Sequence, residues 1–225
     1  MKRRQVSHAH IEEVRRKILS AAKALCIEQG YKKTTIRQIV EKSGVLTGSI
    51  YYLYKNKADI FQAMVLALFK QCVRIMDEDF HEESPAFRYV LMCTVELKAV
   101  ERNELVRESY YEGYTQTGIF EKMVEHAASI TRQLFTAEHP EFTEQDYYER
   151  TLLIKGMMRS CIAKYYFSVE PDTKSCVELT LRTALGLFGV LPAEIDAVLE
   201  RLDRMEPEVC QMVERMLNRQ RQEDI

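Results

Sequence analysis

The chain has 225 residues, of which 46% are hydrophobic and 29% are charged, enough apolar material for a sizeable buried core and too much for a disordered polar chain. Its six cysteines are scattered without C-x-x-C spacing, which argues against a disulfide framework or a zinc site. The formal net charge of −2 conceals an asymmetry: residues 1–57 carry thirteen basic and four acidic side chains, a surplus of nine positive charges, and the rest of the chain has a surplus of eleven negative charges.

The pattern along the chain predicts an all-α protein. Glycine and proline are scarce, with 8 and 5 residues, and apolar residues recur at spacings of three and four. A first helix is predicted over 10–29, with Gly30 as a left-handed stop. The capping-box sequence Thr35-Ile-Arg-Gln38 then starts a short helix that ends near Gly44, where a tight turn is possible. A second short helix is predicted over 47–52, so the pair forms a helix-turn-helix.

Longer helices are predicted beyond this pair. Asn56 caps a helix that runs to about residue 80, and Ser84-Pro85 starts the next helix. Pro207 is expected to break or kink the helical segment that follows Pro192. The intervening helices are predicted over 84–102, 103–114, 118–138, 143–168 and 172–189. Since no low-complexity linker interrupts the chain, we expect two directly packed domains, a three-helix domain over residues 1–56 and a larger helical domain over residues 57–225.

The helix-turn-helix is the segment from which a function can be predicted. The spacing of four apolar residues, Ile39, Val40, Val45 and Ile50, would hold the two short helices at a steep angle by burial. The outer face of the second helix is then free, and it carries small polar groups that can approach base edges and phenolic hydroxyls that can reach phosphates. These outward side chains are Thr47, Gly48, Ser49, Tyr51 and Tyr52.

Basic residues extend this face. Lys55 and Lys57 lie at the start of the following helix, where free backbone amides and the helix dipole also favour an anion. A positively charged head attracts polyanions, and an acidic body is repelled by them. The charge asymmetry therefore supports binding of a nucleic acid through the amino-terminal domain.

The segment from Gly30 to Lys57 resembles the DNA-binding head of the TetR family. The matching elements are Gly30-Tyr31, Thr34-Thr35, Ile39-Val40, Gly44-Val45-Leu46, Gly48-Ser49-Ile50-Tyr51, Tyr54, Lys57 and Ile60, with Ile18-Leu-Ser-Ala-Ala22 upstream. The resemblance covers about the first quarter of the chain. It implies base or phosphate contacts by Thr35, Arg37, Thr47, Gly48, Ser49 and Tyr52, and phosphate contacts by Tyr51 and Lys57.

The sequence departs from the family pattern at Leu46, where the family often has a serine that caps the recognition helix. The cap must therefore shift to Thr47 or be made by the backbone. Tyr54 occupies the position of a buried phenylalanine in the family, so core packing is expected for its ring.

The resemblance further implies a homodimeric transcriptional repressor that leaves its operator DNA when a small molecule enters the carboxy-terminal domain. One helix-turn-helix makes too few contacts for tight and selective binding, so two recognition helices about 34 Å apart are expected. The dimer bundle would use the helices over 143–168 and 172–189. The second of these has a stripe that suits such a seam, although an intrachain core explains the stripe nearly as well; it consists of Cys176, Leu179, Thr180, Thr183, Ala184 and Leu187.

Aromatic and thioether side chains in the larger domain are the candidates for a ligand pocket, because they form adaptable and mostly apolar walls. The alternative for each is ordinary core packing. The candidates are Tyr110, Tyr111, Tyr114, Phe120, Met123, Met157, Met158, Cys161, Tyr165 and Tyr166. A carboxylate among them would favour a cationic aromatic ligand, although solvated charges explain most of the acids; those acids are Glu96, Glu101, Glu104, Glu108 and Glu112.

Other classes of protein fit the sequence poorly. Because there is no leader-like segment and no apolar run near eighteen residues, we expect neither export nor a membrane-spanning segment, and with reduced thiols this predicts the cytoplasm. Without a glycine-rich phosphate loop, metal-ligand spacing or a G-x-S-x-G element, we expect no enzyme, catalytic residue, metal or cofactor. One alternative stays open: a helix-turn-helix regulator whose second domain senses a protein partner instead of a small molecule.

Overall fold

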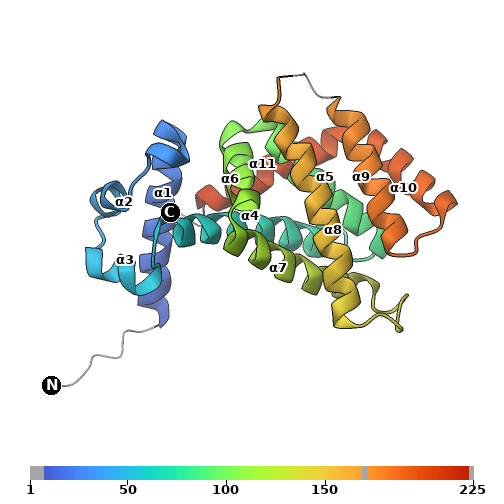
Figure 1. Cartoon of the computed structure of the whole chain (residues 1–225), viewed down its shortest axis with the longest axis horizontal. Helices are drawn as coiled ribbons and strands as arrows, with labels where there is room; N and C mark the ends of the chain where they lie inside the picture. Colours follow the sequence, from blue (N-terminus) through green and yellow to red (C-terminus); the bar gives the residue numbers. More distant parts are fainter. Residues whose placement is uncertain (1–7, 169–171, 223–225) are drawn as a thin grey trace.

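The computed structural model describes residues 8–168 and 172–222 of the chain, and over these residues every regular element is a helix. The all-α fold predicted from the sequence is therefore confirmed. A small three-helix head lies at one end of the molecule and a larger helical body at the other, with the long helix α4 running from one into the other (Figure 1).

The head consists of α1 (His8–Lys33), α2 (Ile36–Ser43) and α3 (Thr47–Leu53). Gly30 interrupts α1 with a φ of +79°, as predicted, but one further helical turn follows it before α2 begins. Thr35 forms the predicted capping box with Gln38 at the start of α2. Gly44 ends α2 in the left-handed region, with a φ of +65°, and thereby sets the turn into α3.

The body begins with α4, whose first turn is capped by Asn56 as predicted. Ser84 caps α5, with Pro85 at its first position. The carboxy-terminal segment breaks at Met205, two residues before Pro207, so the predicted interruption is confirmed. The elements are α4 (Lys57–Asp79), α5 (Pro85–Arg102), α6 (Glu104–Thr115), α7 (Thr117–Phe135), α8 (Glu144–Ala163), the 3-10 turn η1 (Lys164–Tyr166), α9 (Thr173–Leu187), α10 (Pro192–Arg204) and α11 (Glu206–Gln222).

Two helices of the body end three or more residues earlier than predicted. The helix predicted over 143–168 ends at Ala163 and continues as the 3-10 turn η1, in which the Phe167 amide donates to the carbonyl of Lys164, three residues earlier. The helix predicted over 118–138 ends at Phe135, whose carbonyl accepts the amides of both Glu138 and His139 in a turn.

Helix α5 forms the centre of the body. It contacts α4, α6, α7, α8, α9, α10 and α11, and twelve of its residues are buried. Helix α11 packs along α4 and α5 (Figure 1). One charged pair lies within this core: Lys155 Nζ on α8 is 3.0 Å from Glu96 Oε2 on α5, and the two side chains are 5% and 1% exposed. Glu96 is therefore not one of the solvated acids that the sequence suggested.

Candidate nucleic-acid interface

Helices α2 and α3 pack against each other and against α1 through a small apolar core. Ile39 and Ile50 are 1% and 0% exposed and Val45 is also buried, so three of the residues predicted to fix the angle between the two helices lie in the core as expected. The fourth, Val40, is only half-buried and packs against the edge of this core. Tyr54 is buried at the end of α3, as predicted. These contacts orient α3 so that its opposite side faces solvent.

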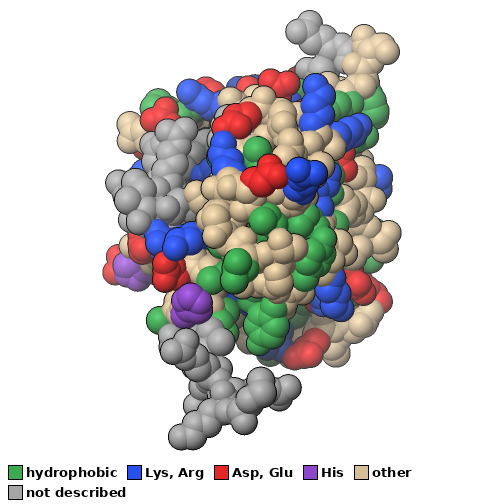
Figure 2. All heavy atoms as spheres, turned by 90° about the vertical axis from the view of Figure 1, so that its left-hand side faces the viewer, with side chains coloured by type: hydrophobic (Ala, Val, Ile, Leu, Met, Phe, Trp, Pro, Cys, Tyr) green, Lys and Arg blue, Asp and Glu red, His purple; other side chains and the backbone are tan. Residues whose placement is uncertain are grey.

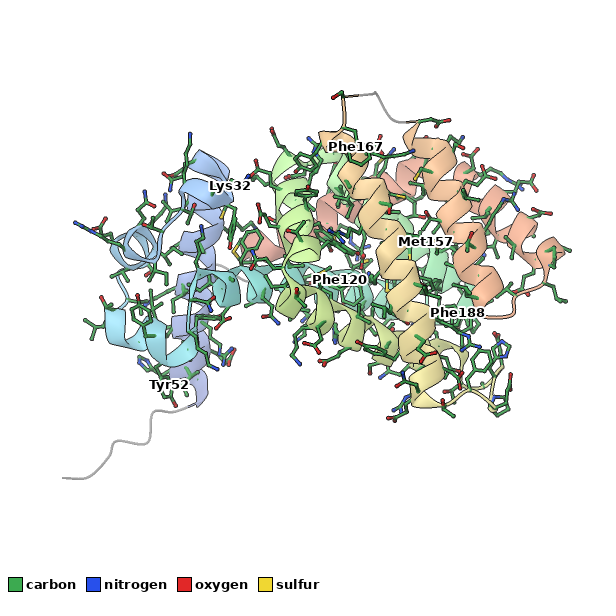
Figure 3. The ribbon with its side chains drawn as sticks, in the orientation of Figure 1. Lys32, Tyr52, Phe120, Met157, Phe167 and Phe188 are labelled. Atoms are coloured by element: carbon green, nitrogen blue, oxygen red, sulfur yellow. The ribbon has the colours of Figure 1, made fainter. Side chains whose placement is uncertain are left out.

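The solvent face of α3 carries most of the outward residues predicted from the sequence. Thr47 and Gly48 are exposed, and Ser49 is half-buried. Tyr51 and Tyr52 are 54% and 78% exposed, although tyrosine rings are usually covered in a folded protein. Figure 3 shows Tyr52 at the edge of the head, well separated from the body. This face combines small polar groups with two phenols that are more than half exposed.

Helix α3 begins without a side-chain cap. Leu46 is its N-cap in an extended conformation, and the Leu46 carbonyl accepts the amides of Ser49 and Ile50, so the backbone makes the first turn. The sequence left two possibilities for this cap, the Thr47 side chain or the backbone, and in the structure the backbone provides it.

The side chain of Leu46 is 79% exposed beside α3, and sequence reasoning did not include it in the site. An apolar side chain at this place can contact the methyl group of thymine. The sequence signal for this residue is the leucine that replaces a capping serine, because it removes a cap and also adds an apolar side chain beside α3.

Two polar candidates on α2 have partners within the helix. Thr35 Oγ1 accepts the amide of Gln38, and Gln38 Oε1 accepts the amide of Thr35 at 2.9 Å. Arg37 Nε donates to Glu41 Oε1 at 3.0 Å, with the arginine side chain 88% exposed. Because an exposed i,i+4 pair is worth only about 0.3–0.5 kcal/mol, the guanidinium group can exchange this partner for a phosphate at little cost.

The two lysines after α3 occupy different environments. The Lys55 side chain is exposed. Lys57 Nζ donates to the Tyr31 carbonyl at 3.0 Å and lies 4.0 Å from the centroid of the Tyr31 ring. Lys57 thus connects the start of α4 to the end of α1, whereas the Lys55 side chain has no hydrogen-bond or ion-pair partner among residues 8–168 and 172–222. Basic side chains lie around exposed apolar side chains on the head surface (Figure 2).

Tyr31 also connects the head to the body. Its hydroxyl accepts a hydrogen bond from Gln116 Nε2 at 3.1 Å, at the junction between α6 and α7, and its ring lies 4.2 Å from that of Phe61 on α4. Burial raises the pKa of the Tyr31 phenol, so the side chain is uncharged at neutral pH. A movement of α4 or of the end of α6 therefore acts directly on the last turn of α1.

A cavity of about 680 Å³ lies in the body, between α5, α8, η1, α9, α10 and α11. Its floor is apolar, with Leu97, Ile162 and Leu181 among the lining residues, and charged side chains form its rim. Of the predicted pocket residues, Cys161 and Tyr165 line this cavity.

The other predicted pocket residues have different surroundings. Tyr110, Tyr114, Met123 and Met158 are buried in the core, and Phe120 packs against Tyr114 with ring centroids 5.5 Å apart. The ring of Tyr111 lies 4.2 Å from that of Tyr166 on η1. Met157 is half-buried where α8 passes α9 (Figure 3). Their role in ligand binding stays a prediction.

The outer faces of α8 and α9 expose apolar side chains. Leu153 on α8 is 60% exposed and Leu179 on α9 is 67% exposed. The predicted α9 stripe is divided between two directions: Thr180 and Ala184 pack into their own chain, whereas Leu179 and Thr183 face solvent. The described helices include none that is long and apolar enough to cross a bilayer.

Comparisons with known proteins agree with this geometry. The sequence model for "Bacterial regulatory proteins, tetR family" matches residues 18–64, which contain α2, α3 and the ends of their flanking helices. A fatty acid metabolism regulator from Bacillus subtilis is 33% identical over 69 residues, covering 31% of this chain and 36% of the relative. The regulator HbdR from Aromatoleum is 50% identical over 50 residues, 22% of each chain. The chain thus matches about a third or less of the length of these curated relatives.

Solved structures extend the likeness of the fold to the body. RolR, solved in complex with resorcinol, has a TM-score of 0.64 at 17% identity, covering 85% of this chain and 95% of its own. TylP, a TetR regulator from Streptomyces fradiae, has a TM-score of 0.61 at 18% identity, covering 93% and 92%. Residues 18–64 thus match the DNA-binding part of the TetR family of bacterial regulatory proteins, and the described chain shares the fold of RolR and TylP along most of its length.

Proposed function

We propose that the protein is a sequence-specific, DNA-binding transcriptional repressor of the cytoplasm, released from its operator by a small molecule. The solvent face of α3 supports this proposal most strongly. Tyr52 on this face is 78% exposed, whereas Ile50 on the opposite face of the helix is completely buried. In this role α3 enters the major groove, Thr47, Gly48 and Ser49 approach base edges, and Tyr51, Lys55 and Arg37 contact phosphates.

Selection of bound sequences from random duplex DNA by the full-length chain tests this proposal. We expect enrichment of a near-palindrome whose half-sites are separated by about 10 base pairs or a multiple of that spacing, because two heads must reach successive faces of the groove. Recovery of unselected sequence after repeated rounds would contradict it.

Substitutions at Gly48 test how closely α3 approaches DNA without disturbing the fold. A methyl group at Gly48 would meet nothing within 4 Å, so Gly48→Ala is expected to stabilise the free protein by about 0.5–1 kcal/mol, as alanine does in helices. Gly48→Leu should fold equally well and weaken operator binding about tenfold, because a larger side chain holds α3 away from the bases.

Gly118 on α7 provides a matched control, since a methyl group there also meets nothing within 4 Å. Fluorescence anisotropy should show normal operator affinity for Gly118→Leu. Equal affinities for Gly48→Leu and the wild type would mean that this part of α3 does not approach DNA closely.

We further propose that the protein dimerises through the outer faces of α8 and α9. Leu153 and Leu179 would be covered in this seam, and the paired chains would place two α3 helices for one operator. Leu153→Glu combined with Leu179→Glu is expected to give a particle of the chain mass, 26.3 kDa, where the wild type gives twice that mass in size-exclusion chromatography with light scattering.

Leu46→Glu is the control for this pair, because Leu46 is even more exposed but lies in the head. It should leave the dimer intact and weaken DNA binding through repulsion from phosphates. A wild-type chain that is monomeric at all concentrations would remove the basis for two half-sites.

The cavity supports a small molecule as the effector. Its volume of about 680 Å³ is within the range of sites for compact ligands, and its apolar floor with polar rim is typical of them. A body that senses a protein partner would need no such cavity. The effector must bind the DNA-incompetent arrangement more tightly, typically by about 1–3 kcal/mol. Helices α4 and α6, which both contact Tyr31 or its neighbours, are the connection from the body to the head.

A further inference from the structure

Two cysteine thiols from neighbouring helices face each other in the body. Cys161 Sγ on α8 lies 3.0 Å from Cys176 Sγ on α9. Thr180 lies beside them: its Oγ1 is 3.3 Å from Cys161 Sγ, and its hydroxyl donates to the Cys176 carbonyl at 2.8 Å. The two thiols are therefore held in contact by the packing of α8 against α9.

The pair is reachable from solvent. Both cysteines line the cavity of about 680 Å³, in which Cys176 is half-buried and Cys161 is 5% exposed. Cys26, Cys72 and Cys93, by contrast, are buried elsewhere in the chain. A small apolar molecule that enters the cavity thus meets Cys176 first and finds Cys161 directly behind it.

We propose that Cys161 and Cys176 form a site of reversible oxidation, in which a small hydroperoxide converts the two thiols to a disulfide. A disulfide has its sulfur atoms about 2.05 Å apart, so the sulfurs must approach by about 1 Å, which is within the reach of side-chain rotation. A peroxide reaches Cys176 through the cavity, and the packing of α8 against α9 places Cys161 beside it as the second thiol.

The reaction proceeds in two steps. The Cys176 thiolate attacks the peroxide, its sulfur forms a bond to oxygen, the O–O bond breaks, and an alcohol or water leaves once protonated. Cys161 sulfur then displaces the hydroxyl group of the Cys176 sulfenic acid, and water carries away the Cys161 proton. The two sulfurs are oxidised and one peroxide is reduced. Cys176 is the attacking thiol because it is the more exposed of the two in the cavity, and Cys161, which is 5% exposed behind it, is the resolving thiol. Burial also raises the pKa of the Cys161 thiol to about 11, in keeping with the resolving role.

Reversal needs only a thiol. A low-molecular-weight thiol attacks the disulfide and, with a second equivalent, restores both cysteines while it is itself oxidised. In a reducing compartment such a disulfide is transient, as is usual for redox-sensing pairs.

The test uses the full-length protein, treated with hydrogen peroxide in one arm and cumene hydroperoxide in the other. The chain has six cysteines, and we expect free thiols counted after denaturation to fall to four. Peptide mapping should join the Cys161 peptide to the Cys176 peptide, and a reducing dithiol should restore six thiols. Six thiols after treatment, or lost thiols that map elsewhere, would overturn the proposal.

Variants assign the chemistry to the pair. Cys161→Ser has five cysteines and should retain no intramolecular disulfide, and Cys176→Ser gives the same result if the first variant folds poorly. Cys210 is the matched control, because it is also half-buried but lies against the Arg102 guanidinium group. Cys210→Ser should fall from five free thiols to three. A Cys210→Ser chain that forms no disulfide would contradict the assignment.

Discussion

Replacing Tyr51 and Tyr52 together with alanine is expected to weaken operator binding about 100-fold. Each phenol can hydrogen-bond a phosphate, a bond to a charged group contributes roughly 1.5 kcal/mol, and 1.4 kcal/mol corresponds to a factor of ten. The melting temperature should change by only a few degrees, because the two rings are 54% and 78% exposed and support little of the core.

The hydroxyl and the ring can be tested separately. Tyr51→Phe with Tyr52→Phe removes only the hydroxyl groups and should reproduce most of the loss if phosphate contacts dominate. Tyr166→Ala, which removes a 47% exposed tyrosine from the body, is the control and should bind DNA normally. Normal binding by the Tyr51→Ala, Tyr52→Ala chain would show that α3 does not contact the operator through these side chains.

Lys155→Met is expected to destabilise the fold by about 3–5 kcal/mol, because it leaves the Glu96 carboxylate buried without its partner. Combining it with Glu96→Leu removes both charges and should recover most of the stability, since apolar replacements of a buried ion pair are often neutral or better. Urea unfolding followed by circular dichroism measures both variants. A single variant as stable as the wild type would mean that water or another group reaches the carboxylate.

The pH dependence of the stability of Lys155→Met identifies the Glu96 carboxylate as the cause of the destabilisation. Burial raises the pKa of Glu96, and the neighbouring lysine offsets part of this effect. Without Lys155 the folded-state pKa rises further, while the unfolded chain keeps the ordinary value of about 4.3. At a pH between these two pKa values the folded state binds a proton at Glu96 that the unfolded state does not bind. The stability deficit of Lys155→Met should therefore shrink as pH falls from 8 toward 5. A deficit that grows on acidification would contradict this explanation.

Local sequence signals located much of this structure because the decisive contacts are only a few residues apart. The capping box of Thr35 and Gln38 and the left-handed Gly44 depend on neighbours within one helical turn, and both were predictable. The same holds for the caps at Asn56 and Ser84. These short-range features fix α2, α3 and the start of α4, and therefore most of the candidate DNA-binding face.

Features that depend on distant parts of the chain were not predictable. The pairing of Glu96 with Lys155 joins residues 59 positions apart, and nothing in either local sequence identifies the partner. The cavity combines α5 with α9, α10 and α11, so only Cys161 and Tyr165 were anticipated among its walls. Lys57 was expected to contact phosphate, but its contact with the Tyr31 carbonyl could be found only once α1 and α4 were placed side by side.

In the proposed dimer α3 of each protomer reads DNA sequence, and paired affinity measurements test this role most directly. The full-length protein is titrated by fluorescence anisotropy against its selected palindrome and against a scrambled duplex of equal length, at one stated salt concentration. We expect the palindrome to bind about a thousandfold more tightly than the scrambled duplex, or better, as specific regulators do. Equal affinity for the two duplexes would contradict it.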